Sequence, residues 1–423
     1  MLANQKQNNY KWYIIAMLWF VCFLNYADRQ AIFALFPLLR VEFRLSNMQL
    51  ALVGSSFMLM YAVFGPFAGW LGDRLSRKWL ILAGLFFWIG ITTATIFARQ
   101  YWQLTALRAL GGITEAVYFP AAMSLISSYH GPETRSRAMS LHQSAVYAGT
   151  VGGGVVASLL GEHFGWRSNF ILFGSMGLVL LCVLLVFLKD PQTAPSATLP
   201  AAATRQSVRA SLRGIFAEVL LAPLVLRLIV AFIGANFVAM VFMVWLPSFL
   251  YNKFHMSLAT AGANATIYLQ AASVGGVLCG GILADMLARK NRGGRMRTQA
   301  VGLLAGALFL FFIGRTRSLQ VLIAGMIGFG FCKGIYESNI WASLHDVVRP
   351  ERRATAVGIM NSLGWLGGGA APLAIAAGSQ RFGMSTCLSA TSVVYIFVAT
   401  ILLWNASSAG KAQDGATQEK LTL

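Results

Sequence analysis

The stretch Gly69-Trp-Leu-Gly-Asp-Arg-Leu-Ser-Arg-Lys78 returns in the second half of the chain as Gly281-Ile-Leu-Ala-Asp-Met-Leu-Ala-Arg-Lys290. Both copies fit the pattern G-x-L-x-D-x-L-x-R-K without a gap, and each follows a long apolar segment. Six matches in a single frame are difficult to explain by chance. An internal repeat of this kind indicates that a structural unit has been duplicated.

A second pair of related stretches lies at nearly the same offset in each half. Pro132-Glu-Thr-Arg-Ser-Arg-Ala138 in the first half corresponds to Pro350-Glu-Arg-Arg-Ala-Thr-Ala356 in the second. Each half therefore carries the same two polar loops on the same side. Because the repeats keep one orientation, we expect the halves to be related by an axis along the membrane normal, with a cavity between them.

The composition predicts a membrane protein. Of 423 residues, 57% are hydrophobic and 11% are charged, whereas about 25% are charged in a typical soluble domain. A membrane span needs about 20 apolar residues, so this length accommodates twelve spans. We place them near 12–35, 48–71, 79–98, 102–127, 138–160, 168–188, 224–251, 259–287, 298–314, 319–344, 354–377 and 385–405.

The fold class that we predict is all-α and integral to the membrane, with twelve transmembrane helices in two six-helix halves. Residues 1–188 form the first bundle, and 189–217 form a polar linker that includes a short interfacial helix near 208–218. Residues 218–406 form the second bundle. The small polar residues of 407–423 predict a disordered tail.

The distribution of positive charge predicts the orientation. The formal net charge is +19, and 21 of the 33 lysines and arginines fall on one side of the predicted spans, 8 on the other and 4 inside them. The richer side is expected to be cytoplasmic, with both termini on it, in the cell membrane or, in a bacterium, the inner membrane. No basic stripe interleaved with aromatic residues suggests a nucleic-acid partner.

The sequence gives no sign of an enzyme or of a bound cofactor. Its five cysteines all lie in apolar segments without metal-ligand spacing, so we expect no metal. No phosphate-binding loop or nucleophile with its base is visible. We therefore expect a monomer without cofactors, whose partners are a small-molecule substrate, protons and the lipid bilayer.

Ionisable residues inside the predicted spans are the candidate functional residues, because a charge at bilayer depth costs about 3 kcal/mol or more unless it is paired or hydrated. Asp28 and Arg108 are expected at similar depth, and Glu115 lies two turns further along the face of Arg108. We expect Glu115 or Asp28 to carry a coupling proton, while Arg108 biases its pKa and binds an anionic substrate. A static ion-pair lattice between helices is the alternative.

Two further cations in the spans leave alternatives open. Arg29 points about 100° away from Asp28 around the helix, and it either faces substrate or snorkels outward. Lys333 either supplies a second substrate-binding cation opposite Arg108 or pairs with Glu337, four residues on.

Several polar residues complete the list of candidates. Those assigned to substrate binding are Tyr61, Tyr147, Tyr336, Asn339 and Asn361, although each alone is as well explained by hydrogen bonds between helices. His142 and His345, near cytoplasmic helix ends, are expected to be solvated or to cap a helix, with tuning of a pH response as the alternative.

The repeated loop resembles the hallmark G-x-L-x-D-R-x-x-R-[RK] of the major facilitator superfamily, and the resemblance spans most of the chain. The resemblance implies that the loop acts as a conformational latch, in which an acid at a helix end pairs with bases of neighbouring helices. A basic loop that only sets topology is the alternative. The second copy departs from the pattern, with Met286 in place of the arginine. The latch residues are Gly69, Asp73, Arg74, Arg77, Lys78, Asp285 and Arg289.

Within that superfamily, two groups are similar to this chain. Asn25-Tyr-Ala-Asp-Arg29 and Arg108-Ala-Leu-Gly-Gly-Ile-Thr-Glu-Ala116 resemble both the anion:cation symporters, which carry organic acids with protons, and the Spinster-like transporters, associated with lysolipids and sphingolipids. Tyr61-Ala-Val-Phe-Gly65 and Ser76-Arg-Lys78 favour the second group. The resemblance implies a proton-coupled carrier of a small organic anion, such as a carboxylate or sugar acid, by alternating access. Transport of lysolipid or another amphipathic compound is the alternative.

Overall fold

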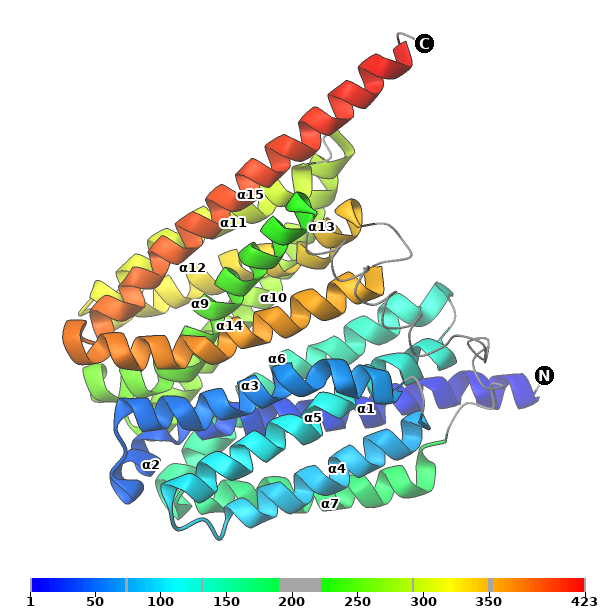
Figure 1. Cartoon of the computed structure of the whole chain (residues 1–423). Coiled ribbons are helices and arrows are strands. Elements are labelled where there is room, and N and C mark those ends of the chain that lie inside the picture. The colour runs from blue at the N-terminus through cyan, green and yellow to red at the C-terminus, as the bar shows by residue number, and fades with distance from the viewer. Residues whose placement is uncertain are drawn as a thin grey trace, which may run out of the picture. The chain divides into compact units, whose positions relative to one another are not determined.

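The computed structural model consists of helices joined by short connections (Figure 1), and it describes residues 2–72, 75–130, 132–189, 222–290, 293–348 and 353–421. No strand occurs in those ranges. The helices are α1 (Leu2–Ala34), α2 (Phe36–Phe43), α3 (Asn47–Gly72), α4 (Arg77–Thr95), α5 (Tyr101–Tyr129), α6 (Pro132–Phe164), α7 (Arg167–Phe187), α9 (Pro223–Phe254), α10 (Leu258–Lys290), α11 (Gly294–Arg315), α12 (Leu319–Glu337), α13 (Ile340–Val347), α14 (Arg353–Phe382) and α15 (Met384–Leu421).

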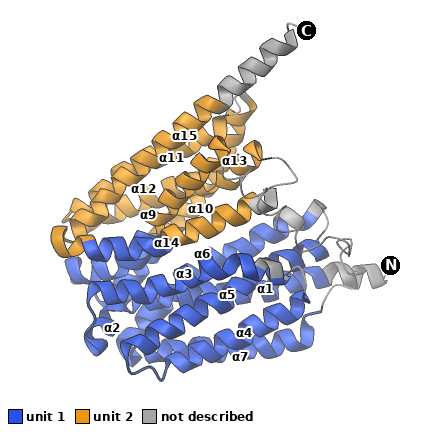
Figure 2. Cartoon of the chain, viewed as in Figure 1, with its two compact units in different colours: residues 1–192, 240–267, 369–377 blue, residues 193–239, 268–368, 378–423 orange. Residues whose placement is uncertain are grey.

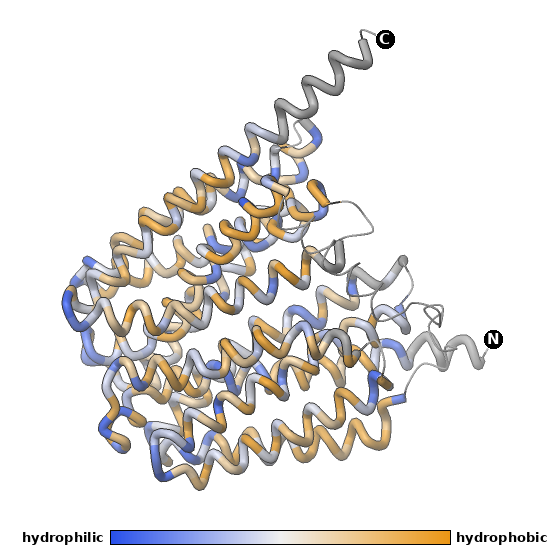
Figure 3. Tube along the Cα trace, viewed as in Figure 1, coloured by the Kyte–Doolittle hydropathy of each residue, from blue (hydrophilic) through white to orange (hydrophobic). Residues whose placement is uncertain are grey.

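Helix length and hydropathy confirm the prediction of an all-α membrane protein. Among the described residues, ten helical segments are long and apolar enough to cross a membrane, and α12 with α13 counts as one of them. Helices α1 and α14 have the length but are more polar, because α1 carries buried polar residues from Asn25 to Gln30 and α14 is rich in glycine. Counted with these two, the described segments are consistent with the twelve predicted spans. Figure 3 shows hydrophobic residues along the helices and hydrophilic residues at their ends.

The chain divides into two compact units, which are coloured in Figure 2. Unit 1 comprises Met1–Gln192, Met240–Ile267 and Gly369–Ala377, and unit 2 comprises Thr193–Ala239, Tyr268–Gly368 and Gly378–Leu423. Parts of α9, α10 and α14 thus group with the N-terminal helices. The predicted domain boundaries near 188 and 217 remain predictions, because residues 190–221, including the expected interfacial helix, lie outside the described part of the chain.

Within unit 1, α1 packs along α6 and α3 packs along α5. Glycine permits both close approaches. A Cβ atom at Gly153 of α6 would lie 2.2 Å from the carbonyl oxygen of Ala27, and one at Gly112 of α5 would lie 2.3 Å from that of Phe57. Any larger residue at either position would push the helices apart. These two contacts fix the rotation of α1 and α5, and with it the direction of their charged side chains.

Within unit 2, α11 packs against both α15 and α12. Helix α15 is bounded by Met384 and Leu421. The disordered tail that we predict for residues 407–423 remains a prediction.

Candidate functional site

Four ionisable side chains of α1 and α5 meet inside unit 1, and we call them the charge cluster. Arg29 Nε lies 2.8 Å from Glu115 Oε2, and Arg108 Nη1 lies 2.8 Å from Asp28 Oδ2. All four are buried, and Glu115 is only 2% exposed. Two positive and two negative charges balance one another, which lowers the cost of holding them in the interior of the protein.

Helix geometry explains why each acid pairs with the base of the other helix. Arg108 and Glu115 are seven residues apart on α5, so they lie two turns apart on one face. Asp28 and Arg29 are neighbours on α1 and point about 100° apart. Asp28 therefore contacts Arg108 at one level of α5. Arg29 contacts Glu115, which lies two turns further along the same helix.

Aromatic rings surround the cations of the charge cluster. The Arg29 guanidinium lies 4.6 Å from the ring centre of Tyr26 and 4.7 Å from those of Phe57 and Tyr61. The Arg108 guanidinium lies 5.0 Å from the ring centre of Phe57. A guanidinium over a ring face is stabilised by the ring quadrupole, most strongly where water is excluded. The rings therefore help to hold both cations in place.

The ion pairs leave some bonding capacity unused. Asp28 Oδ1, Glu115 Oε1 and Arg108 Nε have no hydrogen-bond partner among the described residues. A buried polar atom without a partner costs about 1–3 kcal/mol. Chemically, each carboxylate can accept a proton or a further donor, and Arg108 can donate to a further acceptor.

The pairing bears on two alternatives that the sequence leaves open. Arg29 was expected either to face substrate or to snorkel outward, and snorkelling is wrong, because its side chain is buried and paired with Glu115. Arg108 was expected to act on a carboxylate that could be either Glu115 or Asp28, and it contacts Asp28. Neither pairing could be predicted from the sequence, because both depend on how the two helices are rotated about their axes.

The remaining substrate-binding candidates are divided between the units. Lys333 Nζ lies 2.7 Å from Glu337 Oε1, so the i,i+4 ion pair, one of our two alternatives, is present in α12. Asn339 donates to the Gly280 carbonyl at 3.1 Å, a bond between helices of unit 2. Tyr336 is buried and its hydroxyl has no partner among the described residues. Tyr147 and Asn361 are partly buried.

The loop residues expected to form the latch are only partly described. In the first copy, Asp73 and Arg74 lie outside the described residues, and Gly69 lies within α3. Arg77 donates to Ser128 Oγ, and Lys78 Nζ lies 3.5 Å from the Leu185 carbonyl oxygen.

In the second copy, Arg295 of α11 is the base that contacts the predicted acid. Its guanidinium lies 3.1 Å from Asp285 Oδ1 of α10 and 2.8 Å from Asp346 Oδ2 of α13. One arginine thus joins three helices of unit 2. Arg289, the base that we expected, is exposed and forms no ion pair within the described part of the chain.

The Arg295 bridge yields a testable prediction. A bridge between partly exposed groups contributes up to about 1 kcal/mol, which corresponds to about a fivefold change in the ratio of two conformers. We expect Arg295→Gln to lower the maximal transport rate up to fivefold, measured as initial uptake in proteoliposomes. Arg289→Gln is the matched control, and an equal effect of both variants would contradict a specific bridge.

The expectation for His142 is wrong. It is fully buried in α6 and neither solvated nor capping a helix, because the helix begins ten residues earlier. The Tyr118 hydroxyl donates to the Leu18 carbonyl at 2.6 Å and lies 2.9 Å from His142 Nε2, which therefore donates to it. His345 is partly buried in α13. A buried histidine that links α5 to α6 could not be recognised from its sequence position.

Four contributors to these clusters were missed by sequence reasoning. Phe57 and Tyr26 hold the guanidinium groups, and Arg295 and Asp346 complete the bridge in unit 2. Aromatic residues are common in spans, so neither ring stood out, although Phe57 and Tyr61 lie four apart on one face of α3. Among the described residues, no group of three His, Cys, Asp or Glu side chains is placed to hold a metal ion.

A helical membrane protein with a balanced charge cluster inside its spanning helices, and with duplicated polar loops, has the characteristics of a secondary transporter. The family comparison agrees. Residues 18–372 match the Major Facilitator Superfamily, and the chain belongs to that family.

Individual relatives fall into the two groups suggested by the sequence. The chain is 25% identical over 397 residues to the "Probable galactarate/D-glucarate transporter GudP" of Escherichia coli (strain K12), covering 88% of this chain and 87% of that protein. It is 28% identical over 361 residues to "Protein spinster" of Drosophila melanogaster, covering 82% of this chain and 58% of that protein.

A solved structure shares the fold. The crystal structure of a bacterial homolog to the human lysosomal transporter Spinster, in an inward-facing and unoccupied conformation, superposes with a TM-score of 0.82 at 21% identity. The match covers 95% of this chain and 98% of that one. At this identity the likeness shows the fold alone.

Proposed function

We propose that this transporter couples the movement of a small organic anion, such as a sugar acid, to protons by alternating access. The observation that carries the proposal is the pairing of Arg108 with Asp28 and of Arg29 with Glu115 in a buried site. Sugar-acid transporters among the relatives support the substrate class.

The chemistry follows from charge balance. A substrate carboxylate cannot bind an arginine that is already neutralised, because the site would then hold an excess negative charge away from water. If a proton reaches the paired acid, the acid becomes neutral and its arginine is released. A substrate carboxylate then takes the place of the acid. One proton enters for each substrate carboxylate that binds in this way, so the net charge of the site is unchanged.

Either acid can play this role. Protonation of Asp28 would release Arg108, and protonation of Glu115 would release Arg29. An arginine fork fits a carboxylate through two parallel hydrogen bonds, which suits both arginines to a sugar acid. The rings of Phe57 and Tyr61 would then keep the released guanidinium in position.

The experiment that tests the proposal is uptake into proteoliposomes. Galactarate, D-glucarate and a hexuronate would be offered with and without an inwardly directed proton gradient, and the gradient should drive accumulation above equilibrium. Saturable uptake that ignores the gradient would refute proton coupling. Failure of every anion to bind or move would refute the substrate class.

Transport of an amphipathic compound is the second candidate. The identity of 28% to "Protein spinster" favours it. Lysophospholipid binding to the purified protein, measured beside sugar acids under one condition, separates the candidates. Saturable lysolipid binding without sugar-acid binding would replace the leading proposal.

Lys333 gives a further prediction. If the substrate anion competes with Glu337 for Lys333, then Lys333→Ala removes one charge-assisted hydrogen bond, worth about 1.5–3 kcal/mol. We expect sugar-acid affinity to fall about tenfold or more, and the affinity of a neutral analogue to change little. The control Glu337→Gln leaves the cation in place and should not weaken anion binding. Equal losses for both ligands would indicate a purely structural ion pair.

A further inference from the structure

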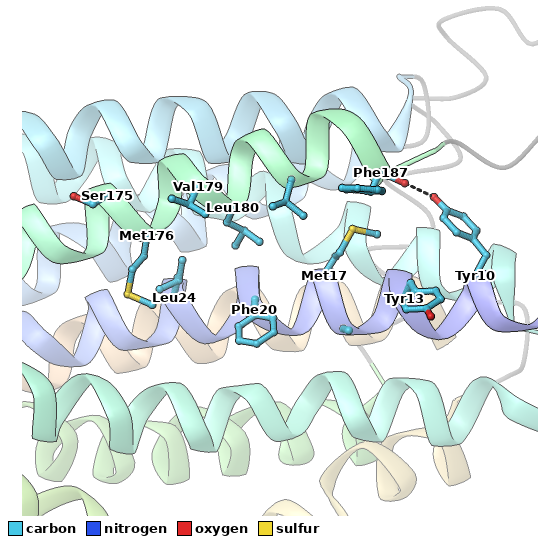
Figure 4. Close-up of a pocket in the computed structure, with 12 residues that line it drawn as sticks. Tyr10, Tyr13, Met17, Phe20, Leu24, Ser175, Met176, Val179, Leu180 and Phe187 are labelled. Atoms are coloured by element: carbon cyan, nitrogen blue, oxygen red, sulfur yellow. Dashed lines mark hydrogen bonds between the residues drawn. The ribbon is translucent and has the colours of Figure 1, made fainter.

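An apolar groove runs between the first and last helices of the N-terminal set, α1 and α7, within unit 1. Figure 4 shows side chains of both helices along its length. Its volume is about 840 Å³. Aliphatic, aromatic and methionine side chains make up most of the lining, among them Met17 and Phe20 of α1 and Met176 and Val179 of α7.

The groove is open on the outside of these helices. Phe20 is 53% exposed and Val179 is 66% exposed, and apolar side chains of this kind on spanning helices lie in hydrocarbon. The lining follows α1 from Tyr10 to Leu24, a rise of about 21 Å at 1.5 Å per residue. One leaflet contributes about 15 Å of hydrocarbon. The groove is therefore long enough for one acyl chain of one leaflet.

A polar group held by hydrogen bonds lies at one end of the groove. The Tyr10 hydroxyl donates to the Phe187 carbonyl at 2.7 Å and accepts from the backbone N–H of Lys189 at 2.9 Å. The Tyr129 hydroxyl donates to the Lys189 carbonyl at 2.9 Å. These bonds hold Lys189 at the end of the groove, with its amino group 6.0 Å from the Tyr10 ring centre.

Positive charge gathers at this same end. Lys189 is exposed and forms no ion pair with a carboxylate of the described residues. Lys11 follows Tyr10 directly, and Lys78 reaches the Leu185 carbonyl near the end of α7. Asp190, outside the described residues, is the one acid adjacent in sequence to this group of three lysines.

We propose that this groove binds an anionic phospholipid of the leaflet in which α1 begins. One acyl chain lies in the groove, and the phosphate lies against Lys189. A basic residue near the membrane surface contributes about 1 kcal/mol to the attraction of anionic lipid. A zwitterionic phospholipid fits the groove and carries the same phosphate, but its own headgroup cation offsets the attraction of the lysines. The proposal does not depend on which solute the protein carries.

Native mass spectrometry of the full chain in detergent tests the proposal. Phosphatidylglycerol and phosphatidylcholine with identical acyl chains would be titrated. Because the contribution of one lysine corresponds to about a fivefold change in affinity, phosphatidylglycerol should bind at least about fivefold more tightly. Lys189→Gln should weaken phosphatidylglycerol binding about fivefold, and Lys11→Gln should add a further loss. Lys253→Gln, at the end of α9, is the matched control.

A second pair of variants tests the groove itself. Ala16 is an exposed residue of the lining, so Ala16→Trp should fill the groove and remove the binding of both lipids. Ala94→Trp is the control, because it fills a different apolar hollow of about 300 Å³, which lies mainly between α4 and α7. If Ala16→Trp fails to fold, the lysine variants, which lie at the surface, decide the question.

Four results would overturn the proposal. The first is equal affinity for the two diacyl lipids. The second is a loss in Lys189→Gln no larger than that in Lys253→Gln. The third is undiminished lipid binding in folded Ala16→Trp. The fourth is tighter binding of lysophosphatidylglycerol than of diacyl phosphatidylglycerol, which would make the groove a site for single-chain amphiphiles.

Discussion

Arg108→Ala will abolish anion uptake, with a loss of at least about 100-fold. Removing one partner of a buried ion pair costs about 3–5 kcal/mol, because Asp28 would remain charged without its cation 2.8 Å away. The substrate would also lose the fork that we propose for its carboxylate. The measurement is initial uptake of a sugar acid in proteoliposomes, normalised to correctly folded protein.

A double variant separates function from folding. Asp28→Asn with Arg108→Gln removes both charges together, so no unpaired charge is left in the site, and the protein should fold. If the ion pair serves substrate binding, uptake stays absent in the double variant. Restored uptake would mean that the pair only holds α1 and α5 together, and Arg108→Lys would then retain most of the activity as well.

Neutralising the coupling acid will abolish proton-driven accumulation while sparing exchange. Glu115→Gln and Asp28→Asn imitate the protonated carboxylic acid. The variant that replaces the proton-carrying acid should therefore still exchange internal for external substrate. We expect accumulation driven by a proton gradient to fall to the equilibrium level in at least one of them. Both reactions are measured in the same vesicles.

Glu162→Gln is the matched control for these two variants. Glu162 is an exposed acid near the end of α6 whose carboxylate accepts from the Ala259 N–H at 2.7 Å, and glutamine can also accept that bond. Normal accumulation in both Glu115→Gln and Asp28→Asn would contradict the assignment of the proton to the charge cluster.

Much of the fold was predictable. Backbone groups in hydrocarbon must be hydrogen-bonded internally, so each span has to be a long apolar helix. The length of such a helix is visible in the sequence. The break between α12 and α13 was not recognised, since residues 319–344 read as one apolar run.

The candidate site was predictable in composition but not in connectivity. Depth along a span follows from residue number, so Asp28, Arg108 and Glu115 could be assigned to one region of the membrane. Rotation about the helix axis decides which acid meets which base, and rotation is set by contacts such as Gly153 on Ala27. Arg295 was missed for the same reason, since its partners lie on α10 and α13.

The balanced charges of Asp28, Arg29, Arg108 and Glu115 also determine how voltage acts on this part of the molecule. Moving one elementary charge across a membrane at 100 mV involves about 2.3 kcal/mol of electrical work. Because these four side chains carry two charges of each sign, their joint displacement involves almost none. At the charge cluster, the membrane potential can therefore drive only those transport steps in which a bound ion or solute changes the net charge of these four side chains and their ligands.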